Sequence, residues 1–130
     1  MSIRNILALI LVLSATPPAL SVDLNGTWKG TLNQVPADPQ TSSYTVVLTV
    51  PSLEKSSVDY PTLKCGGNLS LVRSDNTSAT FREKITRGCE TCEDGGTILV
   101  KKIDANTATY EWKDPNPARG ITCTGQLRKE

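Results

Sequence analysis

The chain has 130 residues, of which 14 are basic, 13 are acidic and none is histidine, so its formal net charge is only +1. A charge this small gives no general attraction for nucleic acid or for an anionic membrane surface, and nucleic-acid binding is not expected. Without histidine the chain lacks the usual base of a hydrolytic triad and the commonest metal ligand. The sequence therefore predicts no catalytic residues, no metal site and no cofactor.

Residues 1–21 have the pattern of a secretory signal peptide. Arg4 precedes an apolar run over residues 6–15, and two prolines then lead to small residues that favour cleavage after Ser21. The apolar run is about half as long as a membrane-spanning helix requires. We therefore expect export to a secreted or periplasmic location, with a single mature domain over residues 22–130 and no membrane span.

Short runs that alternate between polar and apolar residues follow the leader, separated by Gly, Asn, Asp, Ser and Pro, and no run keeps a helical period. In chain order these runs predict seven strands, over residues 28–32, 44–50, 68–73, 79–86, 97–103, 107–113 and 121–127. The longer connections, over residues 33–43 and 51–67, have room for lids or for a short extra strand.

Seven short strands with no helix between them exclude a parallel βαβ architecture. An antiparallel meander must cover one face, either by closing on itself or by packing two sheets together. Because short links join the last strands, we expect an all-β, seven- to eight-stranded antiparallel meander. It would form a closed or nearly closed small barrel stapled by disulfides, with a β-sandwich as the alternative.

All four cysteines, Cys65, Cys89, Cys92 and Cys123, lie in the mature domain, which predicts two disulfides in an oxidising compartment. Cys89 and Cys92 form a CxxC pair, but the acidic residues beside it disfavour the thiolate that redox chemistry uses. No second CxxC completes a zinc site. A Cys89–Cys92 bridge would close a very short loop, so each should pair with a distant partner. Of the two connectivities that remain, we favour Cys65–Cys92 with Cys89–Cys123.

Glu83 breaks the pattern of its strand, because alternation puts it on the same face as Phe81 and Ile85. A buried carboxylate is costly unless it is paired. Glu83 is therefore a ligand- or proton-binding group inside the barrel, a residue at the rim, or the partner of an arginine such as Arg73 or Arg119 in a salt bridge.

Other candidate site residues are aromatic or lie in the acidic loop over residues 87–96. The aromatic candidates would either line a ligand cavity with Glu83 or simply fill the barrel; they are Trp28, Tyr110 and Trp112. The acidic loop would be stapled by the disulfides and is a candidate partner-binding surface; its acidic residues are Glu90, Glu93 and Asp94.

Two resemblances add to these expectations. The segment Asn25-Gly26-Thr27-Trp28-Lys29-Gly30 resembles the G-x-W opening strand of lipocalin-like barrels, in which the Trp closes one end. A longer pattern is YPxLxCGGxL at residues 60–69, FxExI at 81–85, CxxGGxI at 92–98 and YxW at 110–112. It looks like a family of small secreted bacterial β-domains with no assigned function. That likeness implies a Cys65–Cys92 disulfide, with Cys89 and Cys123 as an added pair, and no catalytic residues.

We therefore expect an exported, non-enzymatic binding module of the bacterial envelope or medium that recognises an unidentified ligand or protein through its loops. One alternative is an inhibitor or immunity protein against a secreted hydrolase. Another is a lipocalin-like barrel that binds a small ligand. An enzyme that uses Glu83 and a purely structural envelope component are the remaining classes.

Overall fold

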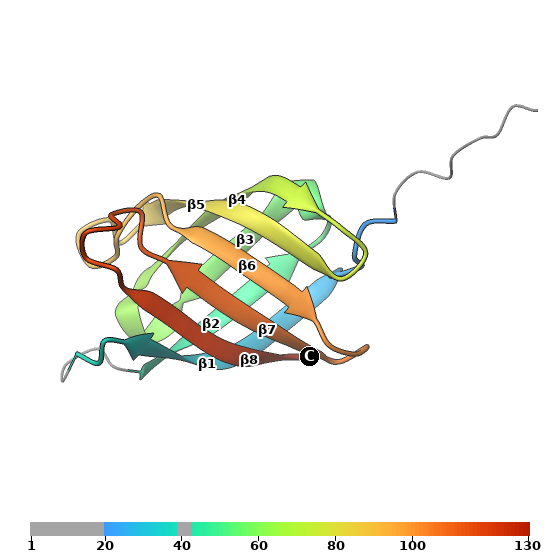
Figure 1. Ribbon diagram of the computed structural model, residues 1–130, viewed down its shortest axis with the longest axis horizontal. Coiled ribbons are helices and arrows are strands. Elements are labelled where there is room, and N and C mark those ends of the chain that lie inside the picture. The colour runs from blue at the N-terminus through green and yellow to red at the C-terminus, as the bar shows by residue number, and fades with distance from the viewer. Residues whose placement is uncertain (1–19, 39–42) are drawn as a thin grey trace, which may run out of the picture.

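The computed structural model describes residues 20–38 and 43–130, which form a closed eight-stranded antiparallel barrel (Figure 1). The predicted signal peptide falls almost entirely on residues 1–19, outside the described residues. None of the helices among the described residues is long and apolar enough to cross a membrane.

The strands follow one another around the barrel in chain order, and the last pairs with the first. They are β1 (Gly26–Val35), β2 (Ser43–Val50), β3 (Ser56–Tyr60), β4 (Cys65–Ser74), β5 (Ser78–Arg87), β6 (Thr97–Lys102), β7 (Thr107–Lys113) and β8 (Thr122–Lys129). Two short 3-10 turns, η1 (Leu53–Lys55) and η2 (Pro61–Leu63), flank β3. The expected closed meander is confirmed, and the sandwich alternative is wrong. The extra strand β3 occupies part of the long connection over residues 51–67.

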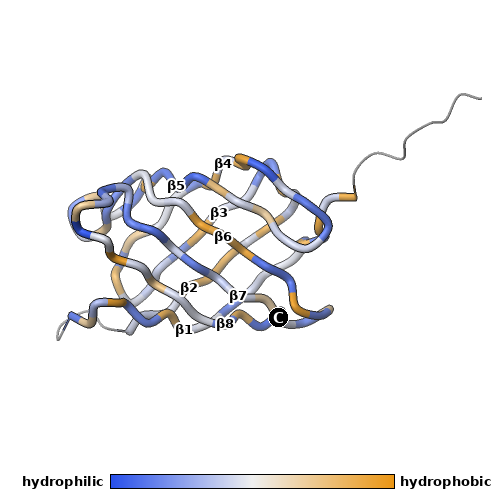
Figure 2. The backbone as a smooth tube through the Cα atoms, in the orientation of Figure 1, coloured by the Kyte–Doolittle hydropathy of each residue, from blue (hydrophilic) through white to orange (hydrophobic). Residues whose placement is uncertain are grey.

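The barrel is filled by the side chains that alternate inward from its strands, and Figure 2 shows this alternation of hydropathy along the backbone. In β5 the three residues predicted to share one face, Phe81, Glu83 and Ile85, are all buried, and Ala79 on the same face is buried with them. Among the largest fully buried side chains are Trp28, Leu32, Leu48, Phe81, Ile98, Tyr110 and Leu127. The apolar residues that alternate with polar ones along the strands therefore pack together as the interior of the barrel.

One end of the barrel is closed by residues 22–25, which we call the N-terminal strap. Val22 and Leu24 are buried, and the backbone N–H of Val22 donates a hydrogen bond to the carbonyl of Asp75 at 2.7 Å. The carbonyl of Leu24 accepts a 2.8 Å hydrogen bond from the indole N–H of Trp28, inside the barrel. The strap and Trp28 together therefore shut this end against solvent.

The predicted Cys65–Cys92 disulfide is present and ties the start of β4 to the loop between β5 and β6. The predicted Cys89–Cys123 bridge is wrong, because both residues are free thiols. Cys123 alternates into the barrel at the start of β8 and is buried, whereas Cys89 is exposed and its sulfur lies 3.6 Å from the carbonyl of Ile85. The single disulfide is compatible with an oxidising, extracellular location.

Candidate functional site

A pocket of about 200 Å³ lies at the end of the barrel opposite the N-terminal strap. Gln34, near the end of β1 away from Trp28, lines it. The pocket reaches into the barrel interior, and its outer wall comes from the loops after β5 and after β7, which lie side by side in Figure 1. Its lining includes Tyr44, Tyr60, Leu63, Glu83, Trp112 and Arg119.

Glu83 is the central polar group of this pocket, although the residue as a whole is only 2% exposed. Its Oε2 accepts a hydrogen bond from the Tyr60 hydroxyl at 2.5 Å, and its Oε1 accepts one from the indole N–H of Trp112 at 3.0 Å. The Tyr60 oxygen also lies 2.6 Å from the Tyr110 hydroxyl. Because Tyr60 donates its proton to Glu83, Tyr110 is the donor in this second bond. A chain of three polar side chains thus runs into the barrel.

The predicted salt bridge from Glu83 to Arg73 or Arg119 is not formed. The ion pairs found over residues 20–38 and 43–130 do not include Glu83. The carboxylate instead accepts hydrogen bonds from the neutral donors of Tyr60 and Trp112. No buried side-chain nitrogen or oxygen in this part of the chain lacks a hydrogen-bond partner. Glu83 is therefore hydrogen-bonded inside the barrel without a protein cation beside it.

Burial raises the pKa of Glu83 above its usual range, because loss of hydration disfavours the ionised form. The hydrogen bonds from Tyr60 and Trp112 lower that pKa in part, and the charge of Asp94 raises it again. Burial also raises the pKa values of Tyr60 and Tyr110 well above the ordinary tyrosine value. Both hydroxyls therefore remain protonated and able to donate at any pH near neutrality.

The raised pKa predicts how Glu83 affects stability as pH changes. The folded protein holds the Glu83 proton more tightly than the unfolded chain does, so this group adds stability below the unfolded pKa, and the gain is lost as pH rises through the folded pKa. Urea unfolding of wild type and Glu83→Gln, between about pH 4 and pH 8, should show the wild type becoming less stable relative to the variant as pH rises. A stability difference that stays constant with pH would contradict this assignment.

Trp112 reaches Glu83 because its ring packs against a residue without a side chain. A Cβ added at Gly96 would overlap the indole nitrogen of Trp112 and would lie 2.6 Å from its Cε2. The carbonyl of Gly96 also accepts the backbone N–H of Glu83 at 2.8 Å. Gly96 therefore sets both the backbone position of Glu83 and the position of the indole that donates to it.

Gly96→Ala should displace the Trp112 ring and break its hydrogen bond to Glu83, at a cost of about 1–3 kcal/mol in the free energy of unfolding. NMR of the labelled protein would follow the two indole N–H resonances. The Trp112 resonance should shift strongly. That of Trp28, which is bonded to Leu24 at the other end of the barrel, should stay in place. An unmoved Trp112 resonance would show that the ring does not depend on Gly96.

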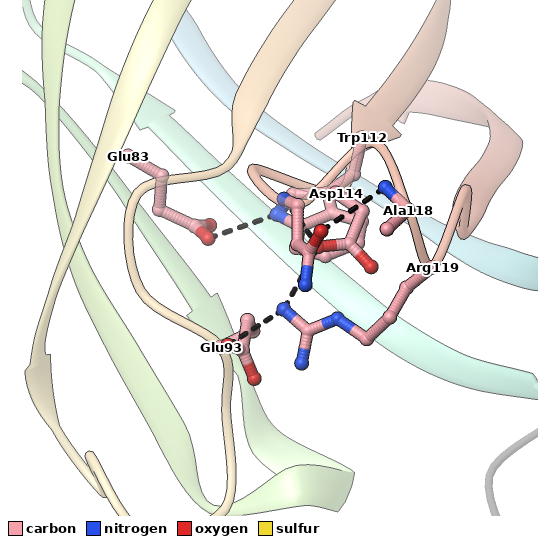
Figure 3. A network of polar contacts seen from close by, with 7 residues as sticks. Glu83, Glu93, Trp112, Asp114, Ala118 and Arg119 are labelled. Atoms are coloured by element: carbon pink, nitrogen blue, oxygen red, sulfur yellow. Dashed lines mark hydrogen bonds and ion pairs between the residues drawn. The ribbon is translucent and has the colours of Figure 1, made fainter.

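Arg119 joins the two loops across the mouth of the pocket (Figure 3). Its Nη2 lies 2.8 Å from Glu93 Oε1 in the β5–β6 loop and 3.0 Å from Asp114 Oδ1 after β7. The Asp114 side chain is only 2% exposed, whereas the Arg119 and Glu93 side chains are roughly half-exposed, so the outer pair adds at most about 1 kcal/mol to stability. Among the described residues, the charged side chains that line the pocket are those of Glu83, Glu93, Asp114 and Arg119.

The structure divides the aromatic candidates between the two ends of the barrel. Trp112 lines the pocket beside Glu83, and Tyr110 lies behind it, joined to Glu83 through Tyr60. Trp28 is fully buried at the closed end, where it packs with the N-terminal strap. Of the two interpretations given to Trp28, filling of the barrel therefore describes its position.

The acidic candidates of the loop have three different environments. Glu93 lines the pocket and pairs with Arg119. Asp94 accepts the backbone N–H of Ile85 at 2.8 Å and so fastens the loop to β5. Glu90 is exposed. Only the first of these residues takes part in the pocket itself.

Several lining residues were not predicted as parts of a ligand site, and they include Tyr44, Tyr60, Leu63, Asp114 and Ile121. Tyr44 begins the strand predicted over residues 44–50, but alternation within one strand does not say which end of the barrel a residue occupies. Tyr60 is the last residue of β3, a strand that was not predicted because three of its five residues are polar or charged. Its position in the YPxLxCGG pattern was the signal that could have found it.

The groups that meet here are suited to binding a ligand: a carboxylate, aromatic rings and hydrogen-bond donors around a small volume. In the part of the chain that the structure describes, no group of three or more cysteine or carboxylate side chains could hold a metal ion. Comparisons with family models, with curated proteins and with solved structures find no match to this chain. The geometry of the pocket is therefore the basis for a functional interpretation.

Proposed function

We propose that this protein is an exported, non-enzymatic binding module that holds a small ligand in the pocket at the open end of its barrel. The observation that carries this proposal is Glu83, a buried carboxylate that lines the pocket and forms no ion pair with any described residue. Burying such a group is unfavourable for folding. Its retention at the base of a pocket is explained by a ligand that interacts with it.

The size and lining of the pocket support a small ligand. Its volume of about 200 Å³ exceeds the ~150 Å³ of an engineered protein cavity that binds benzene. The walls combine apolar and aromatic groups, among them Leu63, Trp112 and Ile121, with a few polar groups. Such a lining is typical of small-molecule sites, in which apolar contacts supply affinity and polar groups fix orientation.

The pocket is also held open before a ligand arrives. The Cys65–Cys92 disulfide and the Asp94–Ile85 hydrogen bond restrain the β5–β6 loop, and the Arg119 ion pairs join that loop to the one after β7. A site that is already ordered loses little conformational entropy on binding. The disulfide and the signal-like residues 1–21 support export as part of the same proposal.

Native mass spectrometry of the protein purified from its own exporting host tests this function. We expect a small adduct on the wild type, and its loss in Ile121→Trp, where a larger side chain would fill the pocket from its wall. Ile103→Trp is the matched control, because Ile103 is 56% exposed and does not line the pocket. A bare mass for the wild type, or an adduct that persists in Ile121→Trp, would contradict the proposal.

A protein partner is the second candidate, supported by the exposed acidic groups of the stapled loop. Glu90 and Glu93 lie on a loop that the disulfide makes rigid, as would suit an inhibitor of a secreted hydrolase. The same mass spectra would then contain a complex with a second protein. Alanine at both positions should dissociate that complex; a complex unaffected by both changes would exclude this use of the loop.

A further inference from the structure

We propose that the ligand is a small organic cation, an amine or a guanidine, whose charge is neutralised by Glu83 and whose carbon skeleton packs against the aromatic rings of the pocket. This inference rests on the proposed function of the same pocket and specifies the chemistry of what it binds. Three features of the site lead to it: the balance of charge, the free acceptor positions of Glu83, and the rings around it.

The balance of charge in the pocket is negative. Its lining includes Glu83, Glu93 and Asp114 but a single cation among the described residues, Arg119. Arg119 is already engaged, because the same Nη2 atom contacts Glu93 and Asp114 at the mouth. Glu83 is thus left without a positive partner deeper in the pocket. An anionic ligand would meet this carboxylate at short range in a site shielded from water, where like charges repel strongly.

Glu83 has acceptor positions to spare. A carboxylate offers about four lone-pair sites, and the structure uses one on each oxygen, for Tyr60 and for Trp112. An ammonium or guanidinium group brings several donors and no acceptor, so it fits the remaining positions. A neutral ligand would leave the charge of the carboxylate uncompensated.

The aromatic rings provide the rest of the site. Tyr44, Tyr60 and Trp112 all line the pocket, and the rings of Tyr44 and Tyr60 meet edge to face with centroids 5.6 Å apart. Ring faces attract cations through their quadrupole, and this attraction is strongest where water is excluded. Apolar contact with the same rings would hold the uncharged part of the ligand.

Three probes with one ring and different charges test the inference: benzylamine, benzyl alcohol and benzoate. The chain has two tryptophans, and NMR of the labelled protein reports on both. The indole N–H of Trp112 is bonded to Glu83, whereas that of Trp28 is bonded to Leu24 at the closed end. Benzylamine should shift the Trp112 resonance saturably and leave the Trp28 resonance unmoved. It should bind at least about tenfold more tightly than benzyl alcohol, and benzoate should bind least.

The variants separate the charge from the shape of the pocket. Glu83→Gln should reduce the affinity for benzylamine to that for benzyl alcohol and leave the affinity for the alcohol unchanged. Glu90→Gln removes one acid from the exposed loop and should change neither affinity. Tyr44→Leu removes a ring and should weaken the amine more than the alcohol; Tyr44→Phe keeps the ring and should not. These Tyr44 variants and the comparison of probes on wild type do not depend on the folding of Glu83→Gln.

Equal binding of the amine and the alcohol, benzylamine binding that survives Glu83→Gln, or no response of Trp112 to benzylamine would each overturn the inference. These outcomes are distinct from failure of the proposed function, which the adduct on the natural protein and its loss in Ile121→Trp decide. If the natural adduct is neutral and the protein does not prefer the amine to the alcohol, the proposed function stands and the inference of a cationic ligand fails.

Discussion

Replacing Trp28 with alanine should lower the free energy of unfolding by about 3–5 kcal/mol, the range seen when a large aromatic side chain is deleted from a core. Trp28 is fully buried, so the change would leave a cavity at the closed end of the barrel. It would also remove the 2.8 Å hydrogen bond to the carbonyl of Leu24, which holds the N-terminal strap. Urea unfolding at equilibrium, with the slope checked for a change in cooperativity, measures the loss.

Trp28→Phe is the intermediate variant, because it keeps one aromatic ring at this site and removes the indole N–H together with part of the ring volume. The expected cost is smaller than for alanine, and about 1–3 kcal/mol of it comes from a buried carbonyl left without its partner. The strap retains other contacts in both variants, such as the 2.9 Å hydrogen bond from Lys102 Nζ to the carbonyl of Asp23. A loss below about 1 kcal/mol for Trp28→Ala would show that this end of the barrel is not closed by Trp28.

Removing the Cys65–Cys92 disulfide by a double change to alanine should cost about 2–4 kcal/mol. The bond joins residues 27 positions apart, so its loss frees a long loop in the unfolded chain. The same bond fixes the β5–β6 loop that forms one wall of the pocket. We therefore expect weaker ligand binding as well as lower stability, measured by urea unfolding and by the shift of the Trp112 indole resonance.

Cys89→Ser is the control for this prediction, because Cys89 is a free and exposed thiol. It should change stability by no more than about 0.5 kcal/mol. Thiol labelling gives an independent check: Cys89 should react in the native protein, and Cys123, which is buried, only after unfolding. Destabilisation by Cys89→Ser as large as that from loss of the disulfide, or failure of Cys89 to react in the native protein, would contradict its assignment as a free and exposed thiol.

The barrel could be predicted from the sequence because the alternation that marks each strand lies within one short run of residues. Alternation in single runs identified seven strands and the inward face of β5. The strand β3 was not identified, because its sequence Ser-Ser-Val-Asp-Tyr has one aliphatic residue among polar ones. Its register comes instead from β2 and β4 on either side, as in the pairs Leu48–Val58 and Val58–Gly67. The position of β3 therefore depends on tertiary contacts with its neighbours, which its own sequence does not show.

The site was only partly predictable for the same reason. Glu83 stood out because it contradicts the hydrophobic pattern of its own strand, which a single sequence can show. Its partners come from β3 and β7, and which residues meet across a barrel depends on register and tilt. The same dependence explains the error at Cys89: both free cysteines lie near the pocket end, but one faces inward and the other outward.

The pairing of β1 with β8 has a consequence for how the domain folds. Gly30 lies opposite Leu127, so the seam of the barrel joins residues from nearly opposite ends of the chain. Contacts this distant in sequence are slow to form, because the entropy of closing the loop must be lost before they contribute. As the chain emerges during synthesis, one edge of β1 therefore stays unpaired until residues 122–129 are available. Folding is expected to finish only after this last strand has been made.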